Sequence, residues 1–503
     1  MRVLLVHPSV VNDTPQPPLG VAYVASYLHG ICNHDVRLID LGTQPPVHAV
    51  DTLRKKIKEF NPGIVGISFL TTQFEIAMKC FRMVKSVSNN IITVAGGVHT
   101  SSLPEEVLNQ PAVDFAVFGE GEMTMAELTE AVNTNKTSFE GIKGLGFKKE
   151  GRIMLNSPRE PIKDIDTIPL PFWKDLSKTK YTDLSFRYAD KDSPHDEVRF
   201  FPVLTSRGCP NKCNFCAVNV VSSGKLRFRD PEKVFREIQW LYNDYGARYF
   251  QIIDDTATVK KGNMITLCRM IIDSGMDIKW GCKSRVNTVD PELLGYMKKA
   301  GCRLISFGVE SGDQEILKKI GKNITLEQVK KAFTTTKQTG ILTEAYFMVG
   351  NIGETWESVN RTISFIKELD ADYVGCSITV PFPGTEIYRI IKEKGWLKNI
   401  DYSKFNAAFH FVGDPLPIMR TEAMSQRDLL NAYYKVNSSI VMKKMKLAYG
   451  NKFYLKPTYY KREIFFRIRS MGIRRFASVL YNLFVNRGLT GQRLMKFSRG
   501  AEK

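Results

Sequence analysis

Three cysteines in one short stretch are the residues with the clearest chemical potential. Cys209, Cys213 and Cys216 stand in Cys-Pro-Asn-Lys-Cys-Asn-Phe-Cys, with the spacing Cys-x3-Cys-x2-Cys. A loop this short can wrap three thiolates round one corner of an iron–sulfur cubane. Because a cubane has four irons, three cysteines leave one iron without a protein ligand. A site that only carries electrons is normally fully ligated, so the open iron indicates chemistry here.

The chain around these cysteines predicts where they lie. The apolar run Phe200–Thr205 directly precedes them and is typical of a buried strand. The cysteine loop would then follow the carboxyl end of a strand, where α/β folds keep their active sites. A zinc knuckle is the alternative, but no Cys or His occurs in the twenty residues after Cys216. A disulfide reading fails because the number of cysteines in the motif is odd.

The cysteine motif, with Phe215 before its last member, resembles that of the radical S-adenosylmethionine superfamily. The resemblance implies that the open iron binds the amino and carboxylate groups of S-adenosylmethionine. It also implies that an electron from a 4Fe–4S cluster cleaves the sulfonium and leaves a 5′-deoxyadenosyl radical. A reductant such as flavodoxin or ferredoxin is the expected partner.

Length and composition indicate a globular protein of two or three domains. The chain has 503 residues, of which 43% are hydrophobic and 24% charged. The first residues run straight into an apolar strand with no signal segment, so we expect a reducing cytoplasm. The cysteines outside the motif are expected to be small buried hydrophobes. They are Cys32, Cys80, Cys268, Cys282, Cys302 and Cys376.

Residues 1–135 predict an open, doubly wound parallel sheet of the flavodoxin or Rossmann type, because apolar strands alternate with helical segments. The predicted strands are Val3–His7, Val36–Asp40, Ile64–Phe69, Ile91–Ala95 and Phe115–Phe118. Such sheets bind ligands outside the carboxyl ends of their strands.

Glycines and hydroxyl residues gather at those strand ends. Ser68-Phe-Leu70, followed after a gap by Gly96-Gly97, is similar to two parts of the cobalamin-binding signature. Paired glycines let the backbone approach a buried nucleotide tail, and small hydroxyls can hydrogen-bond it. The first part, Asp-x-His-x-x-Gly, is absent, which puts a histidine-ligated cobalt in doubt. His7 and His99 both lie at predicted strand ends and could face the cofactor, or each could simply cap a loop. The predicted cobalamin contacts are Ser68, Leu70, Thr71, Thr72, Gly96, Gly97, His99, Gly119 and Glu120.

We expect residues 136–197 to be an irregular linker and a cap on the second domain, and residues 198–400 to form a partial barrel of six strand–helix units. The resemblance implies the same fold. The predicted strands are Phe200–Thr205, Tyr249–Ile253, Ile278–Lys283, Leu304–Val309, Leu342–Val349 and Tyr373–Val380. Glycines follow five of the helices, as left-handed caps should. They are Gly246, Gly275, Gly301, Gly340 and Gly395.

Polar residues cluster at the predicted carboxyl ends of the barrel strands. S-adenosylmethionine needs an acceptor for its ammonium, a donor for its carboxylate and an acceptor for its ribose. By position, Asp254 and Asp255 suit the ammonium and Arg285 the carboxylate, while Glu310 or Ser311 suits the carboxylate or the ribose. Thr256 and Glu354 are weaker candidates at the same edge. The alternative for each is a helix cap or a salt bridge at the barrel rim.

Residues 401–503 predict a basic helical extension. Sixteen Lys and Arg but only two Asp and Glu lie between Ile440 and Lys503, so +14 of the net charge of +19 is there. Helices are expected at Met424–Met445 and Ile464–Val485. A basic amphipathic helix can lie on an anionic membrane surface, bind nucleic acid, or pack on the barrel with a solvated basic side. No RNA-binding module is recognisable, so nucleic acid is the least favoured partner.

The resemblance covers residues 1–400 and implies a cobalamin-dependent radical enzyme. The leading interpretation is a C-methyltransferase at an unactivated carbon, acting through the 5′-deoxyadenosyl radical and methylcobalamin. The alternatives are an oxidative cyclase of the tetrapyrrole type and a lipid-modifying radical enzyme that couples carbons. A cobalamin or redox sensor is less favoured because of the open iron. The substrate class, a small molecule or a lipid, is not readable.

Overall fold

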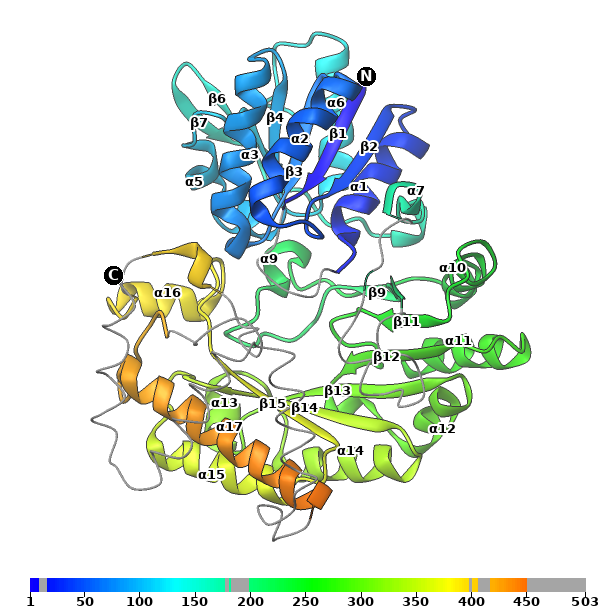
Figure 1. Ribbon diagram of the computed structural model, residues 1–503, viewed down its shortest axis with the longest axis vertical. Helices are drawn as coiled ribbons and strands as arrows, with labels where there is room; N and C mark the ends of the chain where they lie inside the picture. Colours follow the sequence, from blue (N-terminus) through cyan, green and yellow to red (C-terminus); the bar gives the residue numbers. More distant parts are fainter. Residues whose placement is uncertain (9–15, 177–180, 182–198, 398–399, 406–416, 450–503) are drawn as a thin grey trace. The chain divides into compact units, whose positions relative to one another are not determined.

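A computed structural model describes residues 1–8, 16–176, 181, 199–397, 400–405 and 417–449. The chain divides into a large unit, Met1–Asn437, and a second unit, Ser438–Lys503. The large unit holds both predicted α/β domains (Figure 1). Among the described residues, no helix is long and apolar enough to cross a membrane.

The N-terminal domain is built on a seven-stranded sheet with the order β2-β1-β3-β4-β5-β6-β7. Strands β1 to β5 are parallel, while β6 and β7 are antiparallel. The strands are β1 (Arg2–His7), β2 (Asp35–Asp40), β3 (Ile64–Ser68), β4 (Ile92–Gly96), β5 (Phe115–Val117), β6 (Leu145–Lys149) and β7 (Arg152–Leu155). The helices are α1 (Leu19–Gly30), α2 (Pro46–Phe60), α3 (Phe74–Val87), α4 (Val98–Ser102), α5 (Pro104–Leu108), α6 (Gly121–Asn133) and α7 (Trp173–Leu176).

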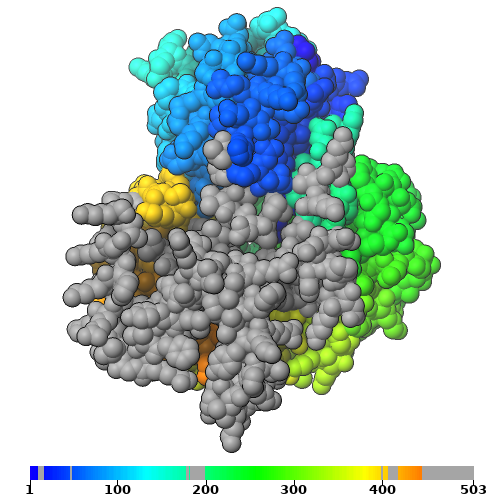
Figure 2. Space-filling model, viewed as in Figure 1, coloured from blue at the N-terminus to red at the C-terminus, as the bar shows by residue number. Residues whose placement is uncertain are grey.

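Helices cover both faces of this sheet, as the alternation predicted. Helices α2, α3 and α5 contribute to a core with one face of β1, β3 and β4, and α1 packs against α6. In α2, Leu53, Ile57 and Phe60 are buried, whereas Arg54 and Lys55 are exposed. Figure 2 shows the surface of the N-terminal part of the chain, which contains this helix, in blue. The apolar stripe at helical spacing therefore decides which side of α2 packs on the sheet.

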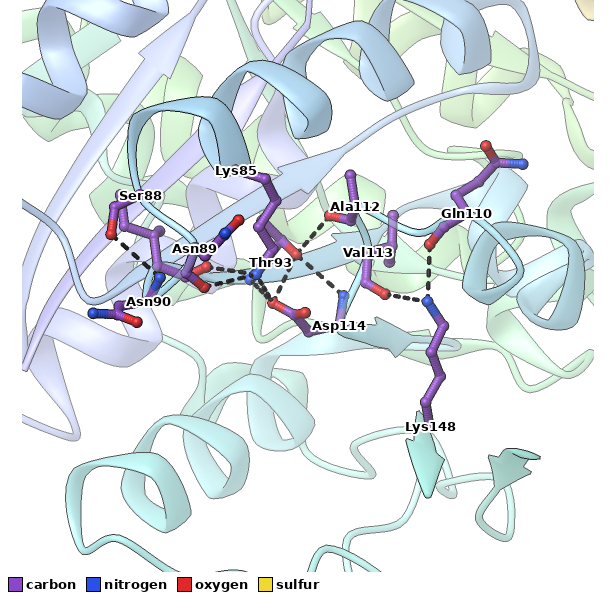
Figure 3. Close-up of polar contacts among 11 residues, drawn as sticks. Lys85, Ser88, Asn89, Asn90, Thr93, Gln110, Ala112, Val113, Asp114 and Lys148 are labelled. Atoms are coloured by element: carbon purple, nitrogen blue, oxygen red, sulfur yellow. Dashed lines mark hydrogen bonds and ion pairs between the residues drawn. The ribbon is translucent and has the colours of Figure 1, made fainter. Parts of the chain in front are cut away.

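Hydrogen bonds and an ion pair stabilise the amino ends of β4 and β5 (Figure 3). Lys85 from α3 forms an ion pair with Asp114 at 2.5 Å and donates to the carbonyl of Ile91 at 2.9 Å. Asp114 also accepts from the backbone N–H of Thr93 at 2.8 Å, and Lys148 of β6 donates to the carbonyl of Val113 at 3.0 Å. These contacts lie at the end of the sheet opposite the predicted ligand edge, so we assign them a structural role.

The interpretation of residues 136–197 as irregular is wrong for residues 145–155. They form β6 and β7, a hairpin that extends the N-terminal sheet, with Leu145 and Phe147 buried. Its two-residue turn has both Glu150 and Gly151 at positive φ, 51° and 74°. Such turns normally carry Asn-Gly or Asp-Gly, and Glu at the first position hides the signal.

Residues 156–176 contact both domains and are not only a cap on the second one. Asp175 accepts from the backbone N–H of Leu38 at 2.8 Å, and the backbone N–H of Phe172 donates to the carbonyl of Ala22 at 3.2 Å. Asp166 accepts from the backbone N–H of Asp230 at 2.7 Å. The domain limits themselves stay a prediction.

The second domain is a six-stranded parallel sheet with the order β15-β14-β13-β12-β11-β8, as expected of the partial barrel. Its strands are β8 (Phe200–Val203), β11 (Tyr249–Ile252), β12 (Lys279–Ser284), β13 (Cys302–Glu310), β14 (Leu342–Val349) and β15 (Tyr373–Ile378). Two short antiparallel strands, β9 (Ser206–Arg207) and β10 (Arg227–Phe228), stand apart from it. The helices are α9 (Val218–Ser222), α10 (Pro231–Asp244), α11 (Lys261–Asp273), α12 (Pro291–Lys299), α13 (Gln314–Lys319), α14 (Leu326–Gln338), α15 (Trp356–Glu368) and α16 (Glu386–Glu393).

Local signals set the ends of these helices. The side chains of Asp290, Thr325, Thr355 and Thr385 cap four helices by accepting from backbone N–H groups. The five glycines predicted as left-handed caps all have φ between 62° and 91°. The local sequence therefore marks the start of four of these helices and the end of five.

Beyond the barrel, the chain returns to the N-terminal domain before its last described helix, α17 (Gln426–Tyr449). Tyr402 and Phe405 are buried in the core that contains α3, and Tyr402 Oη donates to Glu106 at 2.8 Å. Helix α17 overlaps the predicted Met424–Met445. The helix predicted at Ile464–Val485 lies outside the described residues.

Candidate functional site

The three cysteines lie in a loop, residues 208–226, whose two ends are paired as β9 and β10. Gly208 begins the loop with φ 90°, and a side chain on it would clash with the carbonyl of Lys225 on the returning arm. Only glycine allows this close approach. Cys209, Cys213 and Cys216 are half-buried free thiols.

The donor set fits an iron–sulfur cluster better than a single ion. Among the described residues, no three His, Cys, Asp or Glu side chains converge on one metal position. A cubane does not need such convergence, because each cysteine binds a different iron. Burial raises the pKa of the Cys213 thiol and raises that of Cys216 to about 11, so iron must displace protons to bind. Asn211 Nδ2 lies 3.3 Å from Cys209 Sγ, a donor of the kind that tunes cluster sulfurs.

The cysteine loop rests on the barrel through its own backbone. The N–H of Asn214 donates to the carbonyl of Ile320 at 3.1 Å, and the N–H of Ile387 donates to the carbonyl of Asn214 at 3.0 Å. Gly321, at φ 70°, lies so close that a Cβ would come within 2.8 Å of the Lys212 carbonyl. Sequence reasoning did not single out Gly321, although a glycine directly after a short helix was a visible signal.

Asp254 is placed at the entry to the cysteine loop. Its carboxylate accepts from the backbone N–H of Thr205 at 2.7 Å, from the Thr205 hydroxyl at 2.5 Å and from the Ser206 hydroxyl at 2.6 Å. Burial raises its pKa despite these hydrogen bonds. The side chain therefore holds the chain that leads to Cys209, and its predicted contact with an ammonium stays a prediction.

Asp255 offers a more open carboxylate than Asp254. Its side chain is exposed, while that of the adjacent Thr256 is buried. Desolvation by the surrounding chain, and then the negative charge of Asp254, raise the pKa of Asp255 to about 6. Of the two acids predicted for the ammonium, Asp255 is the one with room for a ligand.

Arg285 and Glu310 lie at the carboxyl ends of the neighbouring strands β12 and β13, and both act on the thiol of Cys213 electrostatically. Their contact with S-adenosylmethionine stays a prediction. Lys322 joins them: its Nζ forms an ion pair with Glu310 at 2.8 Å, and its carbonyl accepts from the Arg285 guanidinium. Glu310 has φ 71°, rare for a residue with a side chain, and lies at a bulge between β13 and β14. Such strain is typical of functional sites. Lys322 was missed because it follows a helix rather than a strand.

Ser311 and Glu354 are more enclosed than a ligand contact requires. The Ser311 hydroxyl is buried against Thr362 at 3.2 Å and accepts from the backbone N–H of Asp313. Glu354 accepts from the backbone N–H of Gly350, and burial raises its pKa to about 7. Its other carboxyl oxygen, Oε1, is buried without a partner among the described residues.

The predicted cobalamin edge is lined by glycines with space beside them. Nothing lies within 4 Å of the position that a Cβ would take on Gly96 or Gly119, and Leu70 is 50% exposed. Gly97 has φ 96°, and a Cβ there would meet the carbonyl oxygen of Phe69 at 2.5 Å. Ser68 and Thr72 are half-buried at the same edge. This open, glycine-lined edge fits a large nucleotide-tailed cofactor.

His99 and Thr71 lie beneath this edge rather than on it. His99 is fully buried among the rings of Phe69, Phe74 and Tyr402, and its Nδ1 lies 3.3 Å from Thr71 Oγ1. Burial lowers its pKa to about 4. This environment disfavours the predicted contact of His99 with a cofactor.

His7 and Glu120 already have protein partners. The Gln73 amide donates to His7 Nε2 at 3.1 Å, so Nδ1 carries the proton and donates to Asp40 at 2.8 Å. Arg227 forms two contacts with the Glu120 carboxylate, at 2.8 and 2.9 Å. Glu120 therefore links the cobalamin edge to the cysteine loop, a role that sequence reasoning missed.

Comparison with known proteins agrees with this geometry. The profile of the Radical SAM superfamily matches residues 203–366, and that of the B12 binding domain matches residues 10–129. The first match contains all three motif cysteines. The second contains the glycine-lined edge.

Known relatives span nearly the whole chain. An uncharacterized methyltransferase of Pyrococcus horikoshii is 33% identical over 92% of this chain and 95% of its own. The anaerobic magnesium-protoporphyrin IX monomethyl ester cyclase of Rubrivivax gelatinosus is 30% identical over 88% of this chain and 79% of its own. The solved structure of the cobalamin-dependent S-adenosylmethionine radical enzyme OxsB has a similar fold, with a TM-score of 0.72 at 17% identity over 97% of this chain and 75% of that one. The chain belongs to the radical S-adenosylmethionine superfamily, in the group with an N-terminal B12-binding domain, and its cofactors are a 4Fe–4S cluster, S-adenosylmethionine and cobalamin.

Proposed function

We propose that this cobalamin-dependent radical enzyme transfers a methyl group from S-adenosylmethionine to an unactivated carbon. When bound, the cofactors supply a radical that removes a hydrogen atom and a cobalt that carries the methyl group. The observation that favours methyl transfer is the 33% identity to an uncharacterized methyltransferase of Pyrococcus horikoshii over 92% of this chain. The link between the cysteine loop and the cobalamin edge, where Arg207 Nη1 contacts Glu122 Oε1 at 2.8 Å, supports a reaction that uses both cofactors. A substrate carbon must reach both cofactors, and this link keeps their binding sites together.

Polar side chains on the inner face of the barrel support a substrate with hydrogen-bonding groups. Buried positions of β14, such as Phe347, face the helices, so the alternate residues face inward. Among these, Glu344 accepts from the Ser306 hydroxyl of β13 at 2.6 Å. Lys283 of β12 is exposed on the same side, one strand further. A small molecule with a polar or anionic group suits this face better than an acyl chain does.

The test is a product balance. The enzyme is reconstituted anaerobically with iron, sulfide, cobalamin and a reductant, and incubated with substrate extracts and S-adenosylmethionine labelled with deuterium in its methyl group. Methyl transfer requires one S-adenosylhomocysteine and one 5′-deoxyadenosine for each labelled product. A product without the label would contradict the proposal.

Ring closure is the second candidate, because a magnesium-protoporphyrin cyclase is 30% identical to this chain. It predicts 5′-deoxyadenosine without S-adenosylhomocysteine in the same experiment. A reductant such as flavodoxin or ferredoxin and a cytoplasmic location are part of both proposals.

A further inference from the structure

The base of the cysteine loop is closed by two arginines. Strands β9 and β10 are antiparallel, and Arg207 lies directly opposite Arg227 in their register. The loop 208–226 connects them. Like charges opposite each other destabilise a strand pair, so this pairing needs compensating negative charge.

The N-terminal domain supplies that charge. Arg227 contacts both oxygens of Glu120, at 2.8 and 2.9 Å, and Arg207 contacts Glu122 at 2.8 Å and Glu120 at 3.7 Å. The four side chains are between 4% and 15% exposed. Such buried pairs are highly sensitive to the loss of one partner, because the other charge is then left uncompensated.

Further contacts hold the same four residues in place. Glu120 also accepts from the backbone N–H of Ile162 at 2.9 Å, and Arg227 donates to the carbonyl of Ile162 at 2.8 Å. The Arg207 guanidinium lies over the ring of Tyr23, 4.6 Å from its centroid. Glu120 and Glu122 also lie in or before the first turn of α6, where the helix dipole favours negative charge.

We infer that Glu120, Glu122, Arg207 and Arg227 form a clamp that sets the position of the iron–sulfur cluster relative to cobalamin. Arg207 lies two residues before Cys209, and Glu120 follows Gly119 of the cobalamin edge. One set of ion pairs therefore connects the two cofactor sites. The clamp serves methyl transfer and ring closure alike, so it does not depend on which reaction the enzyme performs.

The test measures the magnetic coupling between the two cofactors. In the loaded protein, reduced cluster and cob(II)alamin are both paramagnetic, and electron paramagnetic resonance reports their mutual broadening. The variants are Arg227→Gln, Arg227→Lys and the double variant Glu120→Gln with Arg227→Gln, which leaves no buried charge alone if a single variant does not fold. The matched control is Glu237→Gln, which breaks the buried pair of Glu237 with Arg229 inside the barrel domain.

We expect the coupling to change in Arg227→Gln and in the double variant, to be intermediate in Arg227→Lys, and to match the wild type in Glu237→Gln. Hydrogen exchange in the protein without cofactors should rise about tenfold for residues 208–226 in Arg227→Gln, because a buried pair is lost. Coupling identical to the wild type in the double variant would overturn the inference. An equal change in Glu237→Gln would overturn it too.

Discussion

One buried carboxylate of the barrel, that of Asp254, holds the backbone next to the cysteine loop in place. Asp254 uses its oxygens to hold Thr205 and Ser206, the residues that lead into the cysteine loop. The sequence predicted Asp254 as a ligand residue because it follows a strand. The structure confirms this position, two residues after the end of β11. The partners of Asp254 could not be predicted, because Thr205 lies 49 residues away in the sequence.

Replacing Asp254 with Asn should loosen the entry to the cysteine loop. The amide nitrogen cannot accept a hydrogen bond, so at least one of the buried donors loses its partner, at a cost of about 2 kcal/mol in the free energy of unfolding. We expect a lower melting temperature and less iron bound after reconstitution. The control is Asp255→Asn. Because the pKa of the Asp255 carboxyl is raised to about 6, losing its charge should not lower the melting temperature at neutral pH. Equal melting temperatures for the wild type and Asp254→Asn would contradict the assignment.

Glu354 makes the stability of the barrel depend on pH. Burial raises its folded-state pKa to about 7, above the ordinary value of 4.5, so the folded state binds more protons between these values. Its contribution to stability is therefore full below about pH 4.5 and is lost as the pH rises through 7. Glu354→Gln removes this loss. Relative to the wild type, the variant should gain up to about 3 kcal/mol between pH 5 and pH 8, measured by urea unfolding. If the free energy of unfolding of the wild type and of Glu354→Gln changed equally with pH, Glu354 would not be the source of the pH dependence.

At the scale of elements, the spacing of apolar residues predicted most of the strands and helices. The strands of both parallel sheets lie within two residues of their predicted bounds. The hairpin at 145–155 escaped prediction because its turn residues, Glu150 and Gly151, are not a usual pair. Its strands are also short, and Lys148 and Lys149 weaken their apolar pattern.

The turn after β4 requires a glycine at position 97. Gly97→Ala combines an unfavourable φ with a clash against the Phe69 carbonyl, so it should destabilise the N-terminal domain by roughly 3 kcal/mol or more. Gly119→Ala is the matched control, since its φ is also positive but its surroundings are open. It should cost only about 1–2 kcal/mol. Thermal unfolding measures both. A smaller effect for Gly97→Ala than for Gly119→Ala would contradict the close approach of Gly97 to the Phe69 backbone.

At the scale of the whole molecule, charge is concentrated at one end of the sequence. Residues 440–503 carry +14 of the net +19. We propose that this extension contacts an anionic membrane surface, one of the three roles that its sequence leaves open, because basic residues near such a surface each contribute about 1 kcal/mol. The full chain should co-sediment with vesicles containing phosphatidylglycerol at low salt and be released by high salt.

Substituting four arginines of the extension with Gln should weaken that binding by at least about 100-fold. They are Arg467, Arg469, Arg474 and Arg475. The control removes four exposed charges from the N-terminal domain and should leave binding unchanged. They are Arg54, Lys55, Lys58 and Lys79. If both variants lost vesicle binding equally, the net charge of the protein would explain the binding, and the extension would have no specific role in it.

The sequence by itself determined the parallel strands of the two sheets, the glycine caps and the cysteine loop, because each is encoded by residue types at short, regular spacing. Only the tertiary structure decided that Glu120 and Glu122 hold Arg227 and Arg207, residues 107 and 85 positions further along the chain. It also decided that His99 is buried under Tyr402. Contacts of this kind arise from the approach of distant segments, and a local pattern carries no record of which segments will meet.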